Sequence, residues 1–300
     1  MSDVHVFCSA VGKAILRAVC DEGVVLSFVI FNNIVGGQDM RKALMILVSA
    51  ALGASMASGA DVVVKSQNIA GFSQATVPSN AFWMVACNFQ KTDGSNEISI
   101  QELFPAEELY MDPTNNAAKC DQIMVFNGSY YKIYTYNQIY SGGYSGSPVW
   151  KDGAKAATNK FKRGEGFWFK RAPESPKTTL TMVGQAPTNT PFAHVSLPKG
   201  FFMMGYAYPK STPLTNLTVN AYMDSANDAA KCDQIMVFDG TSYKTYVWNK
   251  LNDGGNWTTG PFWKYGDTVT SDSLNVGQAA WYKRSADAPN AATWTETKPY

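Results

Sequence analysis

The sequence predicts an all-β protein of two tandem β-sandwich or barrel-like repeats, each of about 115 residues, packed together. Residues 117–126 and 229–238 both read A-A-K-C-D-Q-I-M-V-F, so one part of the chain copies another. Short aromatic strands separated by Gly-containing turns recur around both segments. Because solenoid units are only about 20–50 residues long, repeats of this size are whole small domains. No long flexible spacer separates them, so we expect packed copies.

The repeat extends beyond the identical segment in both directions. Toward the C-terminus, R-G-E-G-F-W-F-K-R (163–171) matches V-G-Q-A-A-W-Y-K-R (276–284). We therefore place copy one at 61–183 and copy two at 184–300.

Residues 40–60 contain the parts of a secretory signal peptide in the required order. Arg41 and Lys42 form a basic start, Ala43–Met56 is an apolar stretch too short to span a bilayer, and small residues follow. A short buried helix is the alternative. Because a signal peptide begins a protein, we interpret residues 1–39 as a mis-called N-terminal extension, with a translated extension as the alternative. The signal predicts a periplasmic, cell-surface or extracellular protein.

The charge balance bears on the partners of the chain. Its 25 basic and 24 acidic residues give a formal net charge of +1. Nucleic acid requires a clustered basic face, so we expect no nucleic-acid partner. No second long apolar run follows the signal, so we expect no integral membrane segment in the mature chain.

Two hairpins are predicted at matching places. Residues 234–248 contain two strand-forming runs separated by Asp239-Gly240, and Asn127-Gly128 takes the same place in copy one. Both turn pairs tolerate the positive φ that a two-residue hairpin turn requires.

Other elements follow from weaker signals. After residue 60 the best helix candidate is Ile100–Leu109, interrupted by Pro105, in a stretch where copy one has residues that copy two lacks. The segments ending in Arg171 and Arg284 predict further strands. Their Lys-Arg pairs are expected to extend along the surface toward water or to terminate an edge strand.

Three cysteines follow the signal, and an odd number leaves at least one thiol outside an intramolecular disulfide. An exported context permits a Cys120–Cys232 disulfide, and a Cys87–Cys120 disulfide is the rival pairing. The remaining alternative is that all three are buried free thiols.

Few residues suggest catalysis. His194 is the single histidine after residue 60, and no metal-ligand, nucleophile or phosphate-loop pattern appears. Asp121 and Asp233 recur, but each directly precedes an apolar strand, which favours a carboxylate bonded to nearby backbone. A glycan hydrolase that uses two carboxylates is the alternative. We predict no catalytic residue, cofactor or metal.

Recurring aromatic residues are the candidate ligand-binding groups. Their rings can either fill the core or stack on sugar rings, and two matching sites would give avidity. The candidates are Trp168, Trp281, Trp150, Trp263, Tyr246 and Trp248.

The chain resembles exported tandem β-repeat proteins of Gram-negative bacteria. The similar features are D-Q-I-M-V-F-D-G-T-S-Y (233–243), the tryptophan that follows it, and G-E-G-F-W-F-K-R (164–171). The resemblance covers most of 68–300. It implies export and a β-rich fold and brings no catalytic residues.

These observations favour a non-enzymatic exported β-protein, acting as a surface-associated or matrix module for binding or structure. A carbohydrate-binding protein with two aromatic stacking sites and a carboxylate-dependent glycan hydrolase are the alternatives. A glycan or cell-surface polymer is the expected partner. An exposed, coplanar Trp/Tyr strip would favour carbohydrate binding, and two carboxylates about 5–10 Å apart across a cleft would favour hydrolysis.

Overall fold

The computed structural model describes residues 4–9, 13–19, 25–31, 70–91, 94–140, 146–187, 192–258 and 260–296. The chain divides into one unit covering residues 1–65 and a second covering residues 66–300. The predicted signal at 40–60 lies outside the described residues.

In the first unit, three strands form an antiparallel sheet within the predicted extension. They are β1 (Val4–Ser9), β2 (Lys13–Val19) and β3 (Val25–Phe31), paired in that order.

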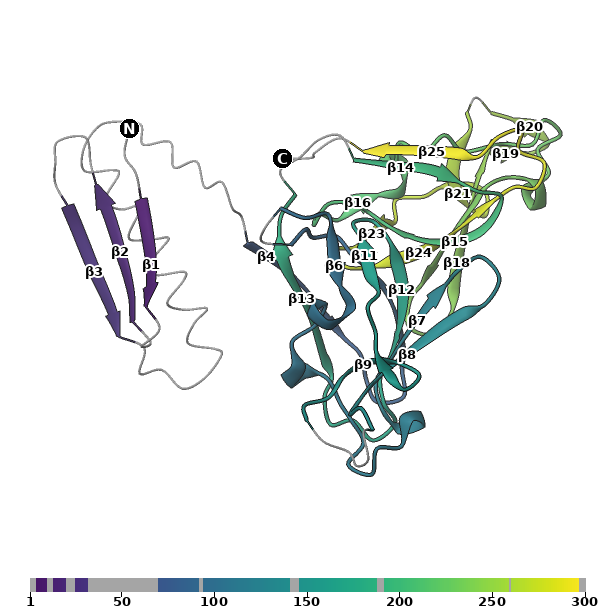
Figure 1. Ribbon diagram of the computed structural model, residues 1–300. Helices are drawn as coiled ribbons and strands as arrows, with labels where there is room; N and C mark the ends of the chain where they lie inside the picture. The colour runs from purple at the N-terminus through teal and green to yellow at the C-terminus, as the bar shows by residue number, and fades with distance from the viewer. Residues whose placement is uncertain are drawn as a thin grey trace. The chain divides into compact units, whose positions relative to one another are not determined.

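The second unit confirms the all-β prediction, because the helices in its described ranges are short 3-10 turns. We name residues 70–187 the first half and residues 192–296 the second half. A six-stranded antiparallel sheet dominates each half (Figure 1). The first sheet runs β5 (Phe82–Ala86), β12 (Gly166–Lys170), β7 (Gln122–Phe126), β8 (Tyr131–Asn137), β9 (Val149–Asp152) and β10 (Lys155–Ala156).

The second sheet has the same order of sequence-matched strands. It runs β15 (Gly200–Gly205), β24 (Ala279–Arg284), β17 (Gln234–Phe238), β18 (Tyr243–Asn249), β21 (Phe262–Tyr265) and β22 (Thr268–Val269). The identical segments thus each contain a 3-10 turn followed by the third strand of the sheet, β7 or β17. The division into two copies stays a prediction, which a strand-by-strand superposition of the halves would test.

Smaller strand pairs accompany the large sheets. In the first half they are β4 (Ala70–Thr76) with β13 (Thr179–Gln185), and β6 (Glu97–Ser99) with β11 (Lys160–Lys162). In the second half they are β14 (Phe192–Leu197) with β25 (Ala292–Glu296), β16 (Thr212–Pro213) with β23 (Ser273–Leu274), and β19 (Asn252–Asp253) with β20 (Asn256–Trp257).

Each half has its own apolar core. In the first half, Ile123 and Phe167 from the large sheet pack in one cluster with Leu180 and Met182 from β13. Burial of one sheet face against a second layer explains why core-facing residues alternate along these strands.

The hairpin turns occur where the sequence predicts them, but the connections are longer than two residues. Phe126 pairs with Tyr131, which leaves a four-residue loop. Only the glycines have positive φ, +99° at Gly128 and +103° at Gly240. The side chain of Asn127 instead accepts hydrogen bonds from the backbone N–H groups of residues 129 and 130.

The predicted helix over Ile100–Leu109 is broken at its proline. Residues Ile100–Glu102 and Ala106–Glu108 form two separate 3-10 turns, and Pro105 caps the second one. Proline lacks the N–H that a continuous helix needs, which accounts for the break.

Candidate functional site

The two large sheets meet through a small cluster of side chains, which we name the junction. It contains Met84, Ala86 and Trp168 from the first half with Ala279 and Trp281 from the second. Backbone groups also connect the halves: Gly205 donates to the carbonyl of Gly164 (N···O 2.9 Å), and Ala86 donates to that of Gly277 (2.9 Å). The halves are therefore joined by both packing and hydrogen bonds.

Trp168 and Trp281 each contact rings of the opposite half. The Trp168 ring lies edge-to-face with Phe238, at 5.2 Å between centroids, and Trp281 lies edge-to-face with Phe126 at the same distance. Trp281 Nε1 donates to the Tyr243 hydroxyl (3.3 Å). Both tryptophans are buried, with 8% and 7% of their surface exposed.

The other candidate aromatic residues lie in the cores of the halves or against them. Trp150 and Trp263 are each 1% exposed, in the first and second core respectively. Tyr246 is also buried, and its hydroxyl donates to Asp272. Trp248 is half-buried, with its ring 5.3 Å from that of Trp263.

The structure does not place the six candidate rings in an exposed coplanar strip. Junction rings cross at steep angles, 74° between Trp168 and Phe238 and 83° between Trp281 and Phe126. Buried rings in edge-to-face contact offer no open face on which a sugar could stack.

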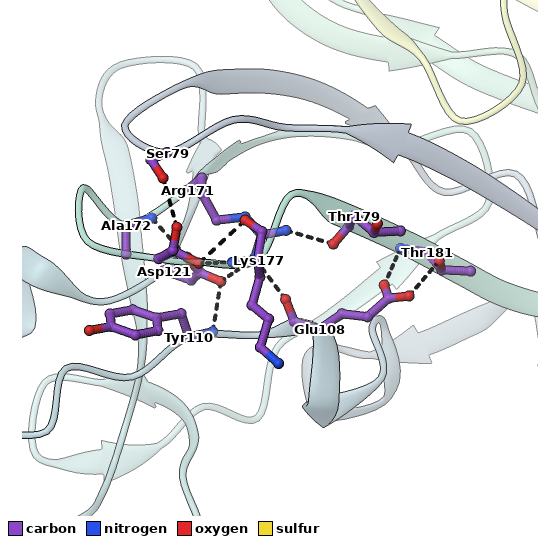
Figure 2. Close-up of polar contacts among 10 residues, drawn as sticks. Ser79, Glu108, Tyr110, Asp121, Arg171, Ala172, Lys177, Thr179 and Thr181 are labelled. Carbon is purple, nitrogen blue, oxygen red and sulfur yellow. Dashed lines mark hydrogen bonds and ion pairs between the residues drawn. The ribbon is translucent and has the colours of Figure 1, made fainter. Parts of the chain in front are cut away.

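The recurring aspartate Asp121 is the centre of a buried polar cluster, as Figure 2 shows. Arg171 Nη1 donates to its Oδ2 atom at 2.6 Å. The backbone N–H groups of Tyr110 and Ala172 donate to its two oxygens, at 2.9 and 2.8 Å. Arg171 Nη2 donates in turn to the carbonyl of Thr179 at 2.7 Å, so one ion pair ties several segments together.

Asp233 has the matching environment in the second half. Arg284 Nη1 donates to its Oδ2 atom at 2.5 Å, and the backbone N–H groups of Tyr222 and Ser285 donate at 2.8 Å each. The Tyr282 hydroxyl adds a fourth donor at 2.5 Å. Burial, followed by the adjacent Asp233, raises the pKa of Tyr282.

Both clusters are closed to ligands. Asp121, Arg171 and Asp233 have no exposed side-chain surface, and 4% of the Arg284 side chain is exposed. Burial raises the pKa of Asp121, and the Arg171 guanidinium is the largest influence that opposes the rise. The prediction for the Lys-Arg pairs is wrong for both arginines, because β12 and β24 are internal strands and the guanidinium groups point inward. Removal of either partner from such a pair would leave an uncompensated charge in the interior, which is strongly destabilising.

The three cysteines are buried free thiols. Cys120 Sγ accepts from the backbone N–H of Asp112 and donates to the carbonyl of Asn116, both within its own half (3.3 Å each). Cys232 has matching contacts in the second half. The structure therefore does not hold a Cys120–Cys232 bond. Burial raises the pKa of Cys87 to about 12, which keeps that thiol protonated.

Metal-ligating residue types do not gather in the part of the chain that the structure describes. His194 lies in β14, and its side chain is outside the described part of the structure. Among the described residues, no group of three or more His, Cys, Asp or Glu could hold a metal ion. No helix in the described ranges is long and apolar enough to cross a membrane.

A cleft of about 360 Å³ opens beside the junction, and no sequence pattern predicted it. The first half contributes strands β4, β5 and β13, and the second half contributes the turn 275–278. Gly277 allows the turn to approach β4 closely, because a Cβ at this position would lie 2.8 Å from Ser73 Oγ. The lining residues are far apart in sequence, so composition and spacing carry no signal for the cleft.

Comparison with family models, with curated proteins and with solved structures returns no match to the chain.

Proposed function

We propose that the chain is a non-enzymatic exported β-protein, a surface-associated or matrix module for binding or structure. The observation that carries the proposal is the use of the recurring polar residues inside the fold. Asp121 and Asp233 recur in the sequence. The carboxylate oxygens of each accept hydrogen bonds from an arginine and from backbone N–H groups. A carboxylate held in this way is not free to transfer a proton to a substrate.

The hydrolase alternative has less support. A glycan hydrolase needs two carboxylates that flank the bond to be cleaved. The cleft beside the junction has no aspartate or glutamate among its described lining residues. The alternative with two aromatic stacking sites loses support from the burial of Trp168 and Trp281.

A retention experiment tests the proposal. The full-length chain, fluorescently labelled, is incubated with intact Gram-negative cells, their extracellular matrix and their purified surface polysaccharides. We expect the folded chain to sediment with one of these polymers and a heat-denatured sample not to do so. Release of new reducing ends from a bound polysaccharide would show catalysis and overturn the proposal, as would failure to sediment with any of them.

Export has a separate test. The basic start and apolar stretch at 40–60 predict cleavage after Ala60, so exported material should begin at Asp61. N-terminal sequencing of protein recovered outside the cytoplasm checks this. Recovery of residues 1–39 on the exported protein would contradict it.

A further inference from the structure

The cleft beside the junction lies at an opening between two layers of the first half. Strand β4 pairs with β13 in one layer, and β5 is the edge strand of the large sheet in the other. The turn 275–278 of the second half borders the same opening. Ligand sites commonly occupy such joints between packed units, with volumes of about 300–1,000 Å³.

One part of the lining is polar and uncharged. Amide and hydroxyl groups come from both halves, and Gln74, Thr76 and Asn275 are exposed to solvent. The Gln74 amide nitrogen donates to the Thr181 hydroxyl (3.1 Å), which holds the Gln74 side chain in place. Amides and hydroxyls combine donors with acceptors, which matches the hydroxyl groups of a polyol.

The other part of the lining is apolar. Trp83 is half-buried, and Val85, Phe104, Leu180 and Met182 are buried behind it. A sugar ring has a C–H face that packs on aromatic and aliphatic surface while its hydroxyl groups point toward polar partners. The cleft presents both kinds of surface together.

The chemistry of the lining also bears on the charge of the ligand. None of the described residues that line the cleft is ionisable. A charged ligand would lose water without gaining a counter-ion, and this desolvation disfavours binding.

We propose that the cleft binds an uncharged sugar ring, free or within a polysaccharide. The proposal rests on the proposed function of a non-enzymatic binding module and assigns that module a ligand class and a site. It places binding on Gln74, Asn275 and Trp83 rather than on the buried tryptophans of the junction.

Calorimetric titration of the full-length chain tests the proposal. The neutral probes are cellotetraose, mannotetraose and N-acetylchitotetraose, the charged probe is tetragalacturonate, and insoluble cellulose, mannan and chitin are tested by sedimentation. We expect binding of at least one neutral probe. Binding of a soluble probe would identify free oligosaccharide as a ligand. Binding to an insoluble polymer alone would identify the ligand as a sugar ring within a polysaccharide.

Substitutions locate the site. Gln74→Ala and Asn275→Ala change exposed side chains from different halves, and each should weaken neutral-sugar binding about three- to tenfold through the loss of a hydrogen bond. Thr76→Trp should block the cleft and abolish binding. Asn256→Ala removes an exposed amide that does not line the cleft, and it should bind within about twofold of wild type.

The outcomes separate this proposal from the proposed function. Neutral-sugar binding that survives all three cleft substitutions overturns the cleft and leaves the module function standing. Binding of tetragalacturonate alone, or of no probe, also overturns the cleft proposal. Cleavage of a bound probe by the wild-type chain overturns the non-enzymatic function, while loss of binding in the cleft variants would still locate the site.

Discussion

At the scale of single residues, the two hairpin turns form a natural comparison between an amide and a carboxylate. Asn127 Oδ1 accepts from two backbone N–H groups at 3.0 and 3.1 Å, and Asp239 Oδ1 accepts from the matching groups at 2.8 Å each. The N–H groups of Ser242 and Thr241 hold the pKa of Asp239 below its ordinary value of 3.8. Only the second turn therefore has a carboxyl group that loses its charge in acid.

The first prediction concerns acid sensitivity. A carboxyl group whose pKa falls on folding stabilises the fold above its unfolded-state pKa, and that stabilisation is lost as the pH falls through the folded-state pKa. Wild type should therefore melt above Asp239→Asn at pH 7, and the difference should shrink and disappear as the pH falls through the lowered folded-state pKa of Asp239. Thermal melting over a pH series measures it.

The reciprocal variant is the control. Asn127→Asp should acquire the same acid-sensitive contribution that Asp239→Asn loses. A difference in Tm between wild type and Asp239→Asn that stays constant as the pH falls through the folded-state pKa of Asp239 would contradict the role assigned to this carboxylate.

The partners of the recurring aspartates could not be predicted from sequence. Asp121 precedes an apolar strand, which predicts a carboxylate bonded to nearby backbone. The structure instead brings Arg171 and Ala172 to it from the end of β12, an approach that depends on strand order. The spacing of these residues along the chain does not show that they meet Asp121 in the fold.

At the scale of elements, the strands were predictable but their faces were not. The alternation along β18 places Tyr246 and Tyr243 on opposite faces, and the structure puts Tyr246 in the core and Tyr243 against Trp168 and Trp281 of the junction. A period of two assigns residues to opposite faces, but it does not say which layer covers each face. Sequence alone therefore does not decide whether Trp168 and Trp281 belong to a core or to a binding site, and the structure places them at the contact between the halves.

The second prediction concerns these tryptophans. Trp168→Ala and Trp281→Ala should each lower the free energy of unfolding by about 3–5 kcal/mol, because each leaves a large cavity between the sheets. Trp257→Ala is the comparison, since 43% of that residue is exposed and its loss should cost less than the loss of either junction tryptophan. Chemical denaturation of all three variants measures the costs. Native-like stability in both junction variants would show that the tryptophans do not hold the sheets together.

At the scale of the whole molecule, the halves approach each other closely at two small residues, Gly205 and Ala86. A Cβ on Gly205 would lie 2.0 Å from the Cβ of Ala86, so the two positions together accommodate one methyl group. Small side chains here allow the sheets to approach closely enough for the flanking tryptophans to reach the opposite half.

The third prediction tests that shared space. Gly205→Ala alone should destabilise the protein by about 1–3 kcal/mol through overpacking. Adding Ala86→Gly should recover much of this cost, so the double variant should be more stable than the sum of the single effects. Denaturant midpoints of the two single variants and the double variant give the coupling. Additive effects would mean that the two positions do not share one space.

The cleft belongs to this largest scale and lies beyond sequence analysis. Gln74 and Asn275 are distant in sequence and line one opening only after the halves pack. Secondary structure depends on local alternation and turn residues, whereas the cleft depends on how two finished sheets meet.

The ring contacts at the junction are reciprocal between the halves, and this has a consequence for how such a chain can originate. Trp168 rests on Phe238 while Trp281 rests on Phe126, so each half both offers and receives the same kind of contact. A surface that is complementary to its own copy is the type that builds two-fold symmetric homodimers. Gene fusion of such a dimer would need only a connecting segment and would preserve the contact. After such a fusion, the two faces would diverge only in step with each other. The identical A-A-K-C-D-Q-I-M-V-F segments end in the strands that carry Phe126 and Phe238.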